Sequence, residues 1–357
     1  MSASCASYLT LKTKLQPLLI YASHPQQSNL ALFVYGLFLA LHCQLPKIAL
    51  RLPLRIRAAS LTQRLERFLK NPLVEASVWY KPFARHLLAP YADGQVRLIL
   101  DATDLGDRFP MLFVALCYRG RALPILWKML PTTGCSTAAT QKALLAQVAP
   151  LLPCRCTVTL LGDREYGSAE LIRFCHQQGW HFCLRAKKNR HFTAANGQKQ
   201  QMKRLPLLPG KTYFLDNIRL PDLPTVRLCL SCGWSSLDKD DEPWYILSDL
   251  PAGGRVLALY AKRFLVEQMF RDFKEQGFRL ESTHLQVVER VSRLVLCVCI
   301  AYVWLLNAGV FAVKLGLRRH IDRHKVRQIS YFQIGLRFLM RAFVLGEELR
   351  CAFSAYP

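Results

Sequence analysis

The spacing of apolar and polar side chains changes three times along the chain. The first and last parts have apolar residues at the three-to-four-residue spacing of helices. Between them, short β-branched runs first alternate with helical segments and then follow one another between turns. The sequence therefore predicts an N-terminal helical region, an α/β core with an inserted β-rich subdomain, and C-terminal helices that complete the core. The corresponding ranges are 1–90, 91–179, 180–250 and 251–357.

Two short apolar runs predict strands of the core. One covers Val96–Leu100 and ends at Asp101, and the other covers Thr157–Leu161 and ends just before Asp163. The remaining elements predicted for this part are a hairpin of Pro110–Tyr118 and Leu123–Leu130, and the helices Ser136–Val148 and Ser168–Gln178.

One apolar run is long enough to cross a lipid bilayer. Leu294–Val313 is interrupted only by Asn307 and Gly309. Because the run contains small and polar residues, we predict a buried core helix and no membrane partner. A membrane protein built around this segment stays the alternative. The shorter run Leu30–Leu45 is predicted to be a core helix of the N-terminal region.

The charge balance indicates a polyanionic partner. The 357 residues include 48 Lys and Arg against 24 Asp and Glu, which gives a formal net charge of +24. Nucleic acid is the usual partner of so basic a chain, because each phosphate contact releases counterions. The thirteen cysteines are scattered and odd in number, which indicates reduced thiols rather than a secreted disulfide framework. With no signal peptide recognised after Met1, a cytoplasmic location is expected.

Positive charge is concentrated in two segments. In Ser60–Lys70, Leu61 and Phe68 lie on one side of a predicted helix and basic residues lie towards another. A second basic segment surrounds His320 and His324, where a tail on DNA is expected rather than a metal site. In the first segment the sequence leaves open a DNA-binding surface or a solvated helix face. The basic residues in this helix and just before it are Arg51, Arg55, Arg57, Arg64, Arg67 and Lys70.

Three carboxylates have the placement of a metal site. Asp101 and Asp163 end predicted strands, where ligands collect in α/β sheets, and Glu267 lies in the middle of a predicted helix. Carboxylates that converge from distant parts of a chain bind hard cations, and two such cations can catalyse phosphoryl transfer. We therefore expect the three side chains to lie within metal-bridging distance. Turn or cap aspartates are the simpler alternative, and Asp104 is a rival to Asp101.

The predicted helix that carries Glu267 has a polar stripe. Arg263, Glu267 and Lys274 follow Tyr260 by three, seven and fourteen positions, which puts all four on one side of a continuous helix. In this arrangement Glu267 would hold a cation and Arg263 and Lys274 would bind phosphates. Tyr260 would hydrogen-bond the DNA backbone or stack. A solvated face with an Arg263–Glu267 salt bridge is the alternative.

The four residues of this stripe resemble the Y-R-E-K signature of a group of bacterial insertion-sequence transposases with a DDE triad. Asp101, two residues before Thr103, is similar to the first aspartate of that family. Asp163, followed by Arg164, is similar to the second. The segment Trp244–Ser248 resembles the strand before the signature helix, with serine at its end in place of the usual threonine.

The resemblance implies a ribonuclease H-like fold, in which a mixed sheet is flanked by helices. It implies that Asp101, Asp163 and Glu267 bind Mg²⁺ (or Mn²⁺), and that the enzyme cleaves DNA at the ends of its mobile element and joins the freed 3′-OH to target DNA. The partners would be double-stranded DNA at the element ends and the target, with a homodimer when synapsed on DNA. The protein would be bacterial, cytoplasmic and nucleoid-associated.

Some residues keep two interpretations. Trp244 either stacks on an unpaired base or lies in the core, and Arg164 is a candidate DNA contact. Cys229 and Cys232 have the spacing of half a zinc site, although no second pair completes a known pattern. The alternative function is a catalytically inactive, transposase-derived DNA-binding protein.

Overall fold

The computed structural model describes residues 3–106, 108–132, 136–235 and 242–355. The chain forms two compact units. The first, which we name the helical unit, comprises residues 1–90, 105–109 and 270–357, and the second, the sheet unit, comprises residues 91–104 and 110–269. The strands predicted for the core and for the β-rich insertion therefore share one unit. The domain ranges taken from the sequence stay a prediction.

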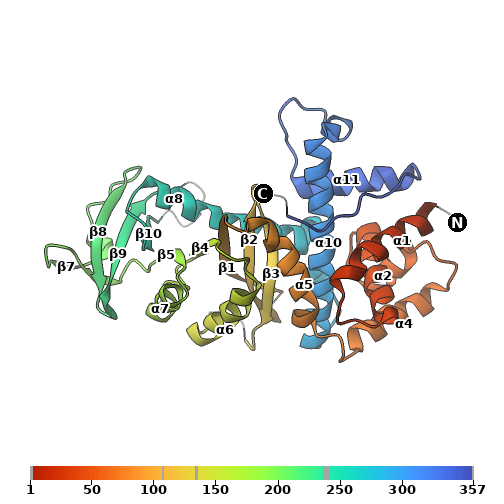
Figure 1. Cartoon of the computed structure of the whole chain (residues 1–357), viewed down its shortest axis with the longest axis horizontal. Coiled ribbons are helices and arrows are strands. Elements are labelled where there is room, and N and C mark those ends of the chain that lie inside the picture. The colour runs from red at the N-terminus through yellow and green to blue at the C-terminus, as the bar shows by residue number, and fades with distance from the viewer. Residues whose placement is uncertain (1–2, 107, 133–135, 236–241, 356–357) are drawn as a thin grey trace. The chain divides into compact units, whose positions relative to one another are not determined.

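The helical unit is built from α1 (Ala3–Leu15), α2 (His24–Ala40), α3 (Leu45–Arg51), α4 (Ala58–Lys70), α5 (Ala76–Leu88), α10 (Val288–Lys314) and α11 (Tyr331–Val344). α10 packs against α2, α4, α5 and α11 (Figure 1). Its Trp304 ring meets the edge of Phe38 at 5.1 Å between centroids. Of its most apolar stretch, 94% is buried, which confirms the predicted core helix.

Length and composition alone would allow a membrane span in this unit. Within the part of the chain that the structure describes, α10 is long and apolar enough to cross a bilayer, and the bent pair of α2 and α3 would be a second candidate if it is counted as one span. α10 belongs to the packed interior, and so does α2 from Leu30 to Phe38.

The sheet is built from β1 (Gln95–Leu105), β2 (Phe109–Tyr118), β3 (Arg121–Met129), β4 (Thr157–Gly162), β5 (His181–Arg185), β6 (His191–Thr193), β7 (Lys199–Gln201), β8 (Tyr213–Leu220), β9 (Leu223–Gly233) and β10 (Trp244–Ser248). Among the described residues these ten strands have the order β3-β2-β1-β4-β5-β10-β9-β8-β6-β7. β1, β4 and β5 are parallel, whereas β10, β9 and β8 pair antiparallel. The accompanying helices are α6 (Ala138–Val148), α7 (Ala169–Gln177), α8 (Gly254–Tyr260) and α9 (Leu265–Arg271). The predicted α/β fold, a mixed sheet flanked by helices, is confirmed.

Local sequence signals set the starts of several helices. The Ser168 hydroxyl accepts a hydrogen bond from the Leu171 amide at the start of α7, and Ser330 does the same for α11. Ser23 begins α2 in a capping box with Gln26. These caps satisfy backbone amides that the first helical turn leaves without partners.

The strand that carries Asp101 is longer than predicted. β1 continues through Asp101 to Leu105, so the prediction that Asp101 ends this strand is wrong. The strand continues because it lies between two neighbours, and β2 remains beside it after β4 has stopped. The parallel pairing with β4 ends at Leu100 opposite Gly162. β4 itself stops at Gly162, which confirms the predicted strand end before Asp163.

Two glycines set the distance between α10 and α11. A Cβ atom on Gly309 would lie 1.8 Å from the carbonyl oxygen of Tyr331, and one on Gly335 would lie 1.8 Å from that of Leu305. Side-chain movement cannot relieve such contacts, because the obstructing atoms belong to the backbone. The packing of α10 on α11 therefore depends on the absence of a side chain at both positions.

We predict that Gly335→Ala forces α10 and α11 apart. Overpacking a core typically costs about 1–3 kcal/mol, and a backbone clash belongs at the upper end of that range. The thermal midpoint, measured by circular dichroism, should therefore fall. Gly254→Ala is the control, because a Cβ atom there meets no heavy atom within 4 Å. Equal midpoints for the two variants would contradict this account of the packing.

Candidate active site

The parallel register of β1 and β4 brings two aspartates next to each other. Asp101 and Asp163 each follow the last registered pair of the two strands. Backbone amides hold both carboxylates: Ala102 donates to Asp101 Oδ1 and Glu165 donates to Asp163 Oδ1, each at 2.9 Å. The two aspartates line one cavity of about 220 Å³, together with Asp104 and other residues.

Glycines allow the turn after β4 to fold tightly around Asp163. A Cβ atom on Gly162 would lie 2.8 Å from the Tyr166 side chain, and one on Gly167 would lie 2.5 Å from the Arg185 carbonyl oxygen. The Tyr166 amide donates to the Asp163 carbonyl at 2.9 Å, and the Tyr166 side chain is buried. The turn is thus anchored at both ends, and this anchoring fixes the direction of Asp163.

Arg263 joins the aspartate on β1 to the predicted helical glutamate. Its Nη1 lies 2.9 Å from Asp101 Oδ2 and its Nη2 lies 3.0 Å from Glu267 Oε1. The Arg263 side chain is only 8% exposed, and its guanidinium lies 4.1 Å from the centroid of the Phe264 ring. One buried cation therefore links carboxylates that are far apart in the sequence.

Burial and like charges act against the ionised form of Asp101. Its side chain is 15% exposed, and burial raises the pKa of the carboxyl to about 7, with further upward contributions from Asp163 and Glu267. The Arg263 guanidinium and the Ala102 amide act in the opposite direction. For Arg263, burial lowers the pKa but the neighbouring carboxylates raise it by more, so the side chain stays a cation.

A comparison with known families decides how this cluster is interpreted. The family profile described as "Transposase DDE domain" matches residues 93–304, which include Asp101, Asp163 and Glu267. The chain belongs to the DDE transposase family. The resemblance inferred from the sequence motifs is thereby confirmed at the level of the family, and the ribonuclease H-like fold class with it.

The other comparisons add little to the description of this transposase. No curated protein matches the chain. Among solved structures, the C-terminal lobe of a budding yeast Argonaute is 10% identical, with coverage of 77% of this chain and 62% of that chain and a TM-score of 0.24. The transposase thus spans less than two thirds of that structure, and a TM-score this low does not indicate a common fold.

The side chains of the transposase site suit a divalent cation by their chemistry. Transposases of this family generally use divalent metals, and carboxylate oxygens are the donors that Mg²⁺ and Mn²⁺ prefer. Burial is the main reason for the raised pKa of Asp101, with smaller contributions from Asp163 and Glu267, and a bound cation would favour the ionised carboxylate. The described residues, however, contain no group of three acidic, histidine or cysteine side chains placed to hold one metal. The predicted metal-bridging distance among all three carboxylates is therefore not found, because Arg263 occupies the place between Asp101 and Glu267.

Two predicted DNA contacts lie in the interior of the sheet unit. Trp244 is 3% exposed and Tyr260 is fully buried. Their rings meet edge to face at 4.8 Å, and Trp244 also stacks on Phe264 at 5.7 Å. Burial raises the pKa of Tyr260 to about 12. The core interpretation of Trp244 fits this placement, and neither ring can reach DNA without leaving its packing.

The predicted polar stripe is not preserved, because the helix changes its winding. The segment Ala261–Phe264 is a 3₁₀ turn and Asp272–Gln276 is a π-helical turn, with α9 between them. The spacing of an ideal α-helix does not apply across such changes, so the prediction of one stripe on a continuous α-helix is wrong. The Arg263–Glu267 salt bridge of the alternative interpretation is present, but only Glu267 is half exposed, whereas Arg263 is buried. Lys274 belongs to the helical unit, where its Nζ lies 3.4 Å from Glu281.

Arg164 remains an accessible cation beside Asp163 in the sequence. Its side chain is 44% exposed, and its Nη1 lies 3.6 Å from Glu242 Oε2. Glu242 also accepts from Lys188 Nζ at 2.5 Å. The sequence did not point to Glu242. This residue contacts Arg164 and Lys188 and holds the two basic side chains near each other, although they are distant in the sequence.

The structure also bears on the alternatives that the sequence left open. Asp104 lies on the same strand as Asp101 and lines the same cavity, but Arg263 pairs with Asp101, which favours Asp101 as the site residue. Cys229 and Cys232 lie three positions apart on β9, which directs their side chains to opposite faces of the strand. The eleven cysteines with described side chains are free thiols.

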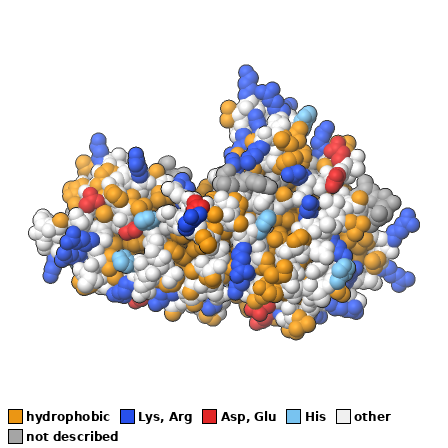
Figure 2. All heavy atoms as spheres, viewed as in Figure 1, with side chains coloured by type: hydrophobic (Ala, Val, Ile, Leu, Met, Phe, Trp, Pro, Cys, Tyr) orange, Lys and Arg blue, Asp and Glu red, His pale blue; other side chains and the backbone are white. Residues whose placement is uncertain are grey.

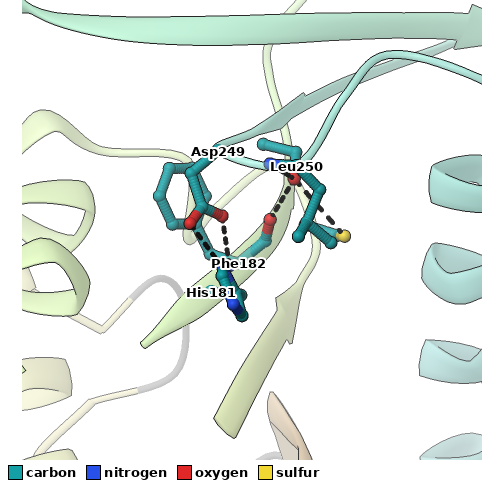
Figure 3. Close-up of polar contacts among 6 residues, drawn as sticks. His181, Phe182, Asp249 and Leu250 are labelled. Atoms are coloured by element: carbon teal, nitrogen blue, oxygen red, sulfur yellow. Dashed lines mark hydrogen bonds and ion pairs between the residues drawn. The ribbon is translucent and has the colours of Figure 1, made fainter. Parts of the chain in front are cut away.

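A second polar cluster joins β5 to the end of β10 (Figure 3). Asp249 accepts from the Phe182 amide at 3.1 Å and contacts His181 Nδ1 at 2.6 Å. Ser248 is buried, and its hydroxyl donates to the Phe182 carbonyl at 2.6 Å and accepts from the Leu250 amide at 3.0 Å. Because the serine donates to a carbonyl and not to His181, these residues secure the strand pairing and do not form a hydrolytic triad.

The Asp101 pKa generates a prediction about metal-free protein. A folded-state pKa of about 7, above the unfolded value, means that the folded state keeps a proton that the unfolded state releases. The stability contributed by Asp101 should therefore fall as pH rises from about 4 to about 7, by at most on the order of 4 kcal/mol. Thermal midpoints of the wild type and Asp101→Asn, measured in EDTA from pH 5 to pH 8, should diverge in favour of Asp101→Asn. A difference that is constant with pH would show that Arg263 keeps Asp101 ionised throughout.

Arg263 gives a second prediction for the same site. Arg263→Ala leaves a buried carboxylate without its cation, and losing one partner of a buried pair costs about 3–5 kcal/mol. Lys70→Ala is the matched control, because Lys70 and Glu66 form an i,i+4 pair that is nearly half exposed, and exposed pairs contribute little to stability. Thermal unfolding should therefore show a much larger loss for Arg263→Ala, and the loss should shrink at low pH as Asp101 takes up a proton. Similar losses for the two variants would mean that the Arg263 cluster is not a buried ion pair.

Proposed function

We propose that this transposase cleaves DNA at the ends of its mobile element and joins the freed 3′-OH to target DNA. The observation that carries the proposal is the gathering of Asp101, Asp163 and Glu267 around the buried guanidinium of Arg263. Carboxylates brought together from two strands and a helix are the ligand type that metal-dependent phosphoryl transfer requires. Membership of the DDE family supports the same assignment.

Asp101, Asp163 and Glu267 would hold Mg²⁺ (or Mn²⁺). When bound, the cation activates the attacking oxygen and stabilises the leaving oxygen of the phosphodiester. The chain itself positions the ligands: the β1–β4 register sets the two aspartates, and Arg263 holds the Glu267 carboxylate at 3.0 Å. Burial of Asp101 keeps water away from one side of the cluster, which strengthens the electrostatic interactions there.

Double-stranded DNA is the proposed partner at both the element ends and the target. The net charge of +24 favours a polyanion, and Arg164 and Lys274 are the proposed phosphate contacts. The burial of Tyr260 and Trp244 supports a different part for them, which is to pack the helix that presents Arg263 and Glu267. A homodimer on synapsed DNA, a bacterial origin in the Y-R-E-K group and a nucleoid-associated location complete the proposal.

Glu267→Gln tests the catalytic assignment. The substitution removes a ligand charge but leaves the basic surfaces intact, so DNA binding should persist while cleavage falls by at least about 100-fold. The assay is cleavage of duplexes that carry the inverted repeats flanking the gene, with Mg²⁺ or Mn²⁺. Glu66→Gln is the matched control, because Glu66 also pairs with a basic residue one helical turn away and lies outside the cluster.

Each outcome of this assay has a separate meaning. Normal cleavage by Glu267→Gln would reduce Glu267 to a salt-bridge partner of Arg263. Wild-type protein that binds the duplex with both metals present but never cuts it would support the catalytically inactive DNA-binding alternative.

A further inference from the structure

The connection between α10 and α11 is a strongly basic loop. We name residues 314–330 the basic loop; residues 314–327 of it contain six Lys or Arg and a single acid, Asp322. Lys and Arg side chains gather over the end of α10 where this loop lies, at the top of the view in Figure 2. The exposed basic residues of the loop are Lys314, Arg319, His320, Arg323, His324, Lys325 and Arg327.

The one acid of the basic loop is buried and organises its backbone. Asp322 is 4% exposed. Its carboxylate accepts from Arg318 Nη1 at 3.0 Å, from the Gln328 amide at 3.1 Å and from the His324 amide at 3.3 Å. Its own amide donates to the Arg318 carbonyl at 2.8 Å. The Asp322 carboxylate is thus paired inside the loop, and it offsets little of the positive charge on the loop's surface.

Two arginines also order the basic loop through hydrogen bonds to its backbone carbonyls. Arg318 is directed inward, and its Nη2 donates to the Lys325 carbonyl at 2.9 Å. Arg327 donates to the Ile329 carbonyl at 3.1 Å, and its guanidinium lies 4.2 Å from the centroid of the Tyr331 ring. These ties hold the backbone in one conformation and leave Arg319, Arg323 and Lys325 to face the solvent.

We propose that the basic loop, as a preorganised surface of the helical unit, binds the phosphate backbone of duplex DNA. This proposal rests on the proposed function, which makes DNA the partner. The ordered backbone presents the exposed side chains of Arg319, Arg323 and Lys325 to phosphate oxygens, and ordering the loop beforehand lowers the entropy cost of binding. An anionic membrane surface is the competing partner, because Val326 and Leu315 are exposed in the same loop. DNA is favoured because the apolar helix α10 next to the loop is buried in protein, so it adds no lipid-facing surface.

Two kinds of variant test the proposal. For each variant, the affinity for a random-sequence duplex is measured as a function of salt concentration. Combining Arg319→Ala, Arg323→Ala and Lys325→Ala should weaken binding and make the salt dependence shallower by about 0.9 per lost contact, or roughly 2–3 in all. Asp322→Asn makes the chain more positive by one charge, yet it should weaken binding by about 3- to 10-fold because the loop loses its order. Glu75→Gln, on the exposed surface of the helical unit, adds the same charge as a control and should leave the affinity equal or slightly higher.

The outcomes separate this proposal from the proposed function. Wild-type protein that fails to bind any duplex would overturn the choice of DNA as partner and this proposal with it. Wild-type binding with an unchanged salt slope in the triple variant would overturn the basic loop alone. Tighter binding by Asp322→Asn would show that only net charge matters. If the triple variant loses binding to phosphatidylserine vesicles and keeps its full affinity for DNA, the loop belongs to a membrane surface and the proposal fails.

Discussion

The parallel pairing of β1 with β4 is the constraint on which the proposed active site depends. It ends at Leu100 opposite Gly162, so the next residues, Asp101 and Asp163, are neighbours by geometry. The pairing requires a crossover that carries the chain from one strand to the next, and the β2–β3 hairpin and α6 lie within it. A shift of β1 by one residue relative to β4 would turn Asp101 to the other face of the sheet and separate it from Asp163 and Arg263.

The electrostatics of the cluster follow from placing several carboxylates around one cation. Arg263 is attracted by Asp101, Glu267 and Asp163, and it cannot fully offset the cost of burying Asp101, whose pKa rises to about 7. Charge crowding of this kind lowers the stability of a fold, and sites that bind cations commonly carry it. Because these charges lie so close together, the proposed ligands Asp101, Asp163 and Glu267 form one electrostatic network with Arg263, the residue that positions them.

Much of the fold was predictable, because local pattern and local structure agreed. The run before Asp163, the hairpin after Asp101 and the buried helix from Leu294 all follow from periodicity and turn residues. The sequence could not show the burial of Trp244, because it depends on ring contacts with the distant Tyr260. Nor could it show where a helix tightens to 3₁₀ or widens to π winding, since tertiary packing decides this. The three carboxylates were predicted from motifs, but the sequence assigned Arg263, the partner of Asp101 and Glu267, to DNA.

The most direct test of the central claim is the position of Mn²⁺ in crystals of the transposase bound to its end DNA, located by anomalous scattering. The account predicts direct coordination of Mn²⁺ by carboxylate oxygens of Asp101 and Asp163, with Glu267 in the same coordination shell. Mn²⁺ bound through Asp104 in place of Asp101, or bound away from all three carboxylates in a complex that cleaves DNA, would contradict it.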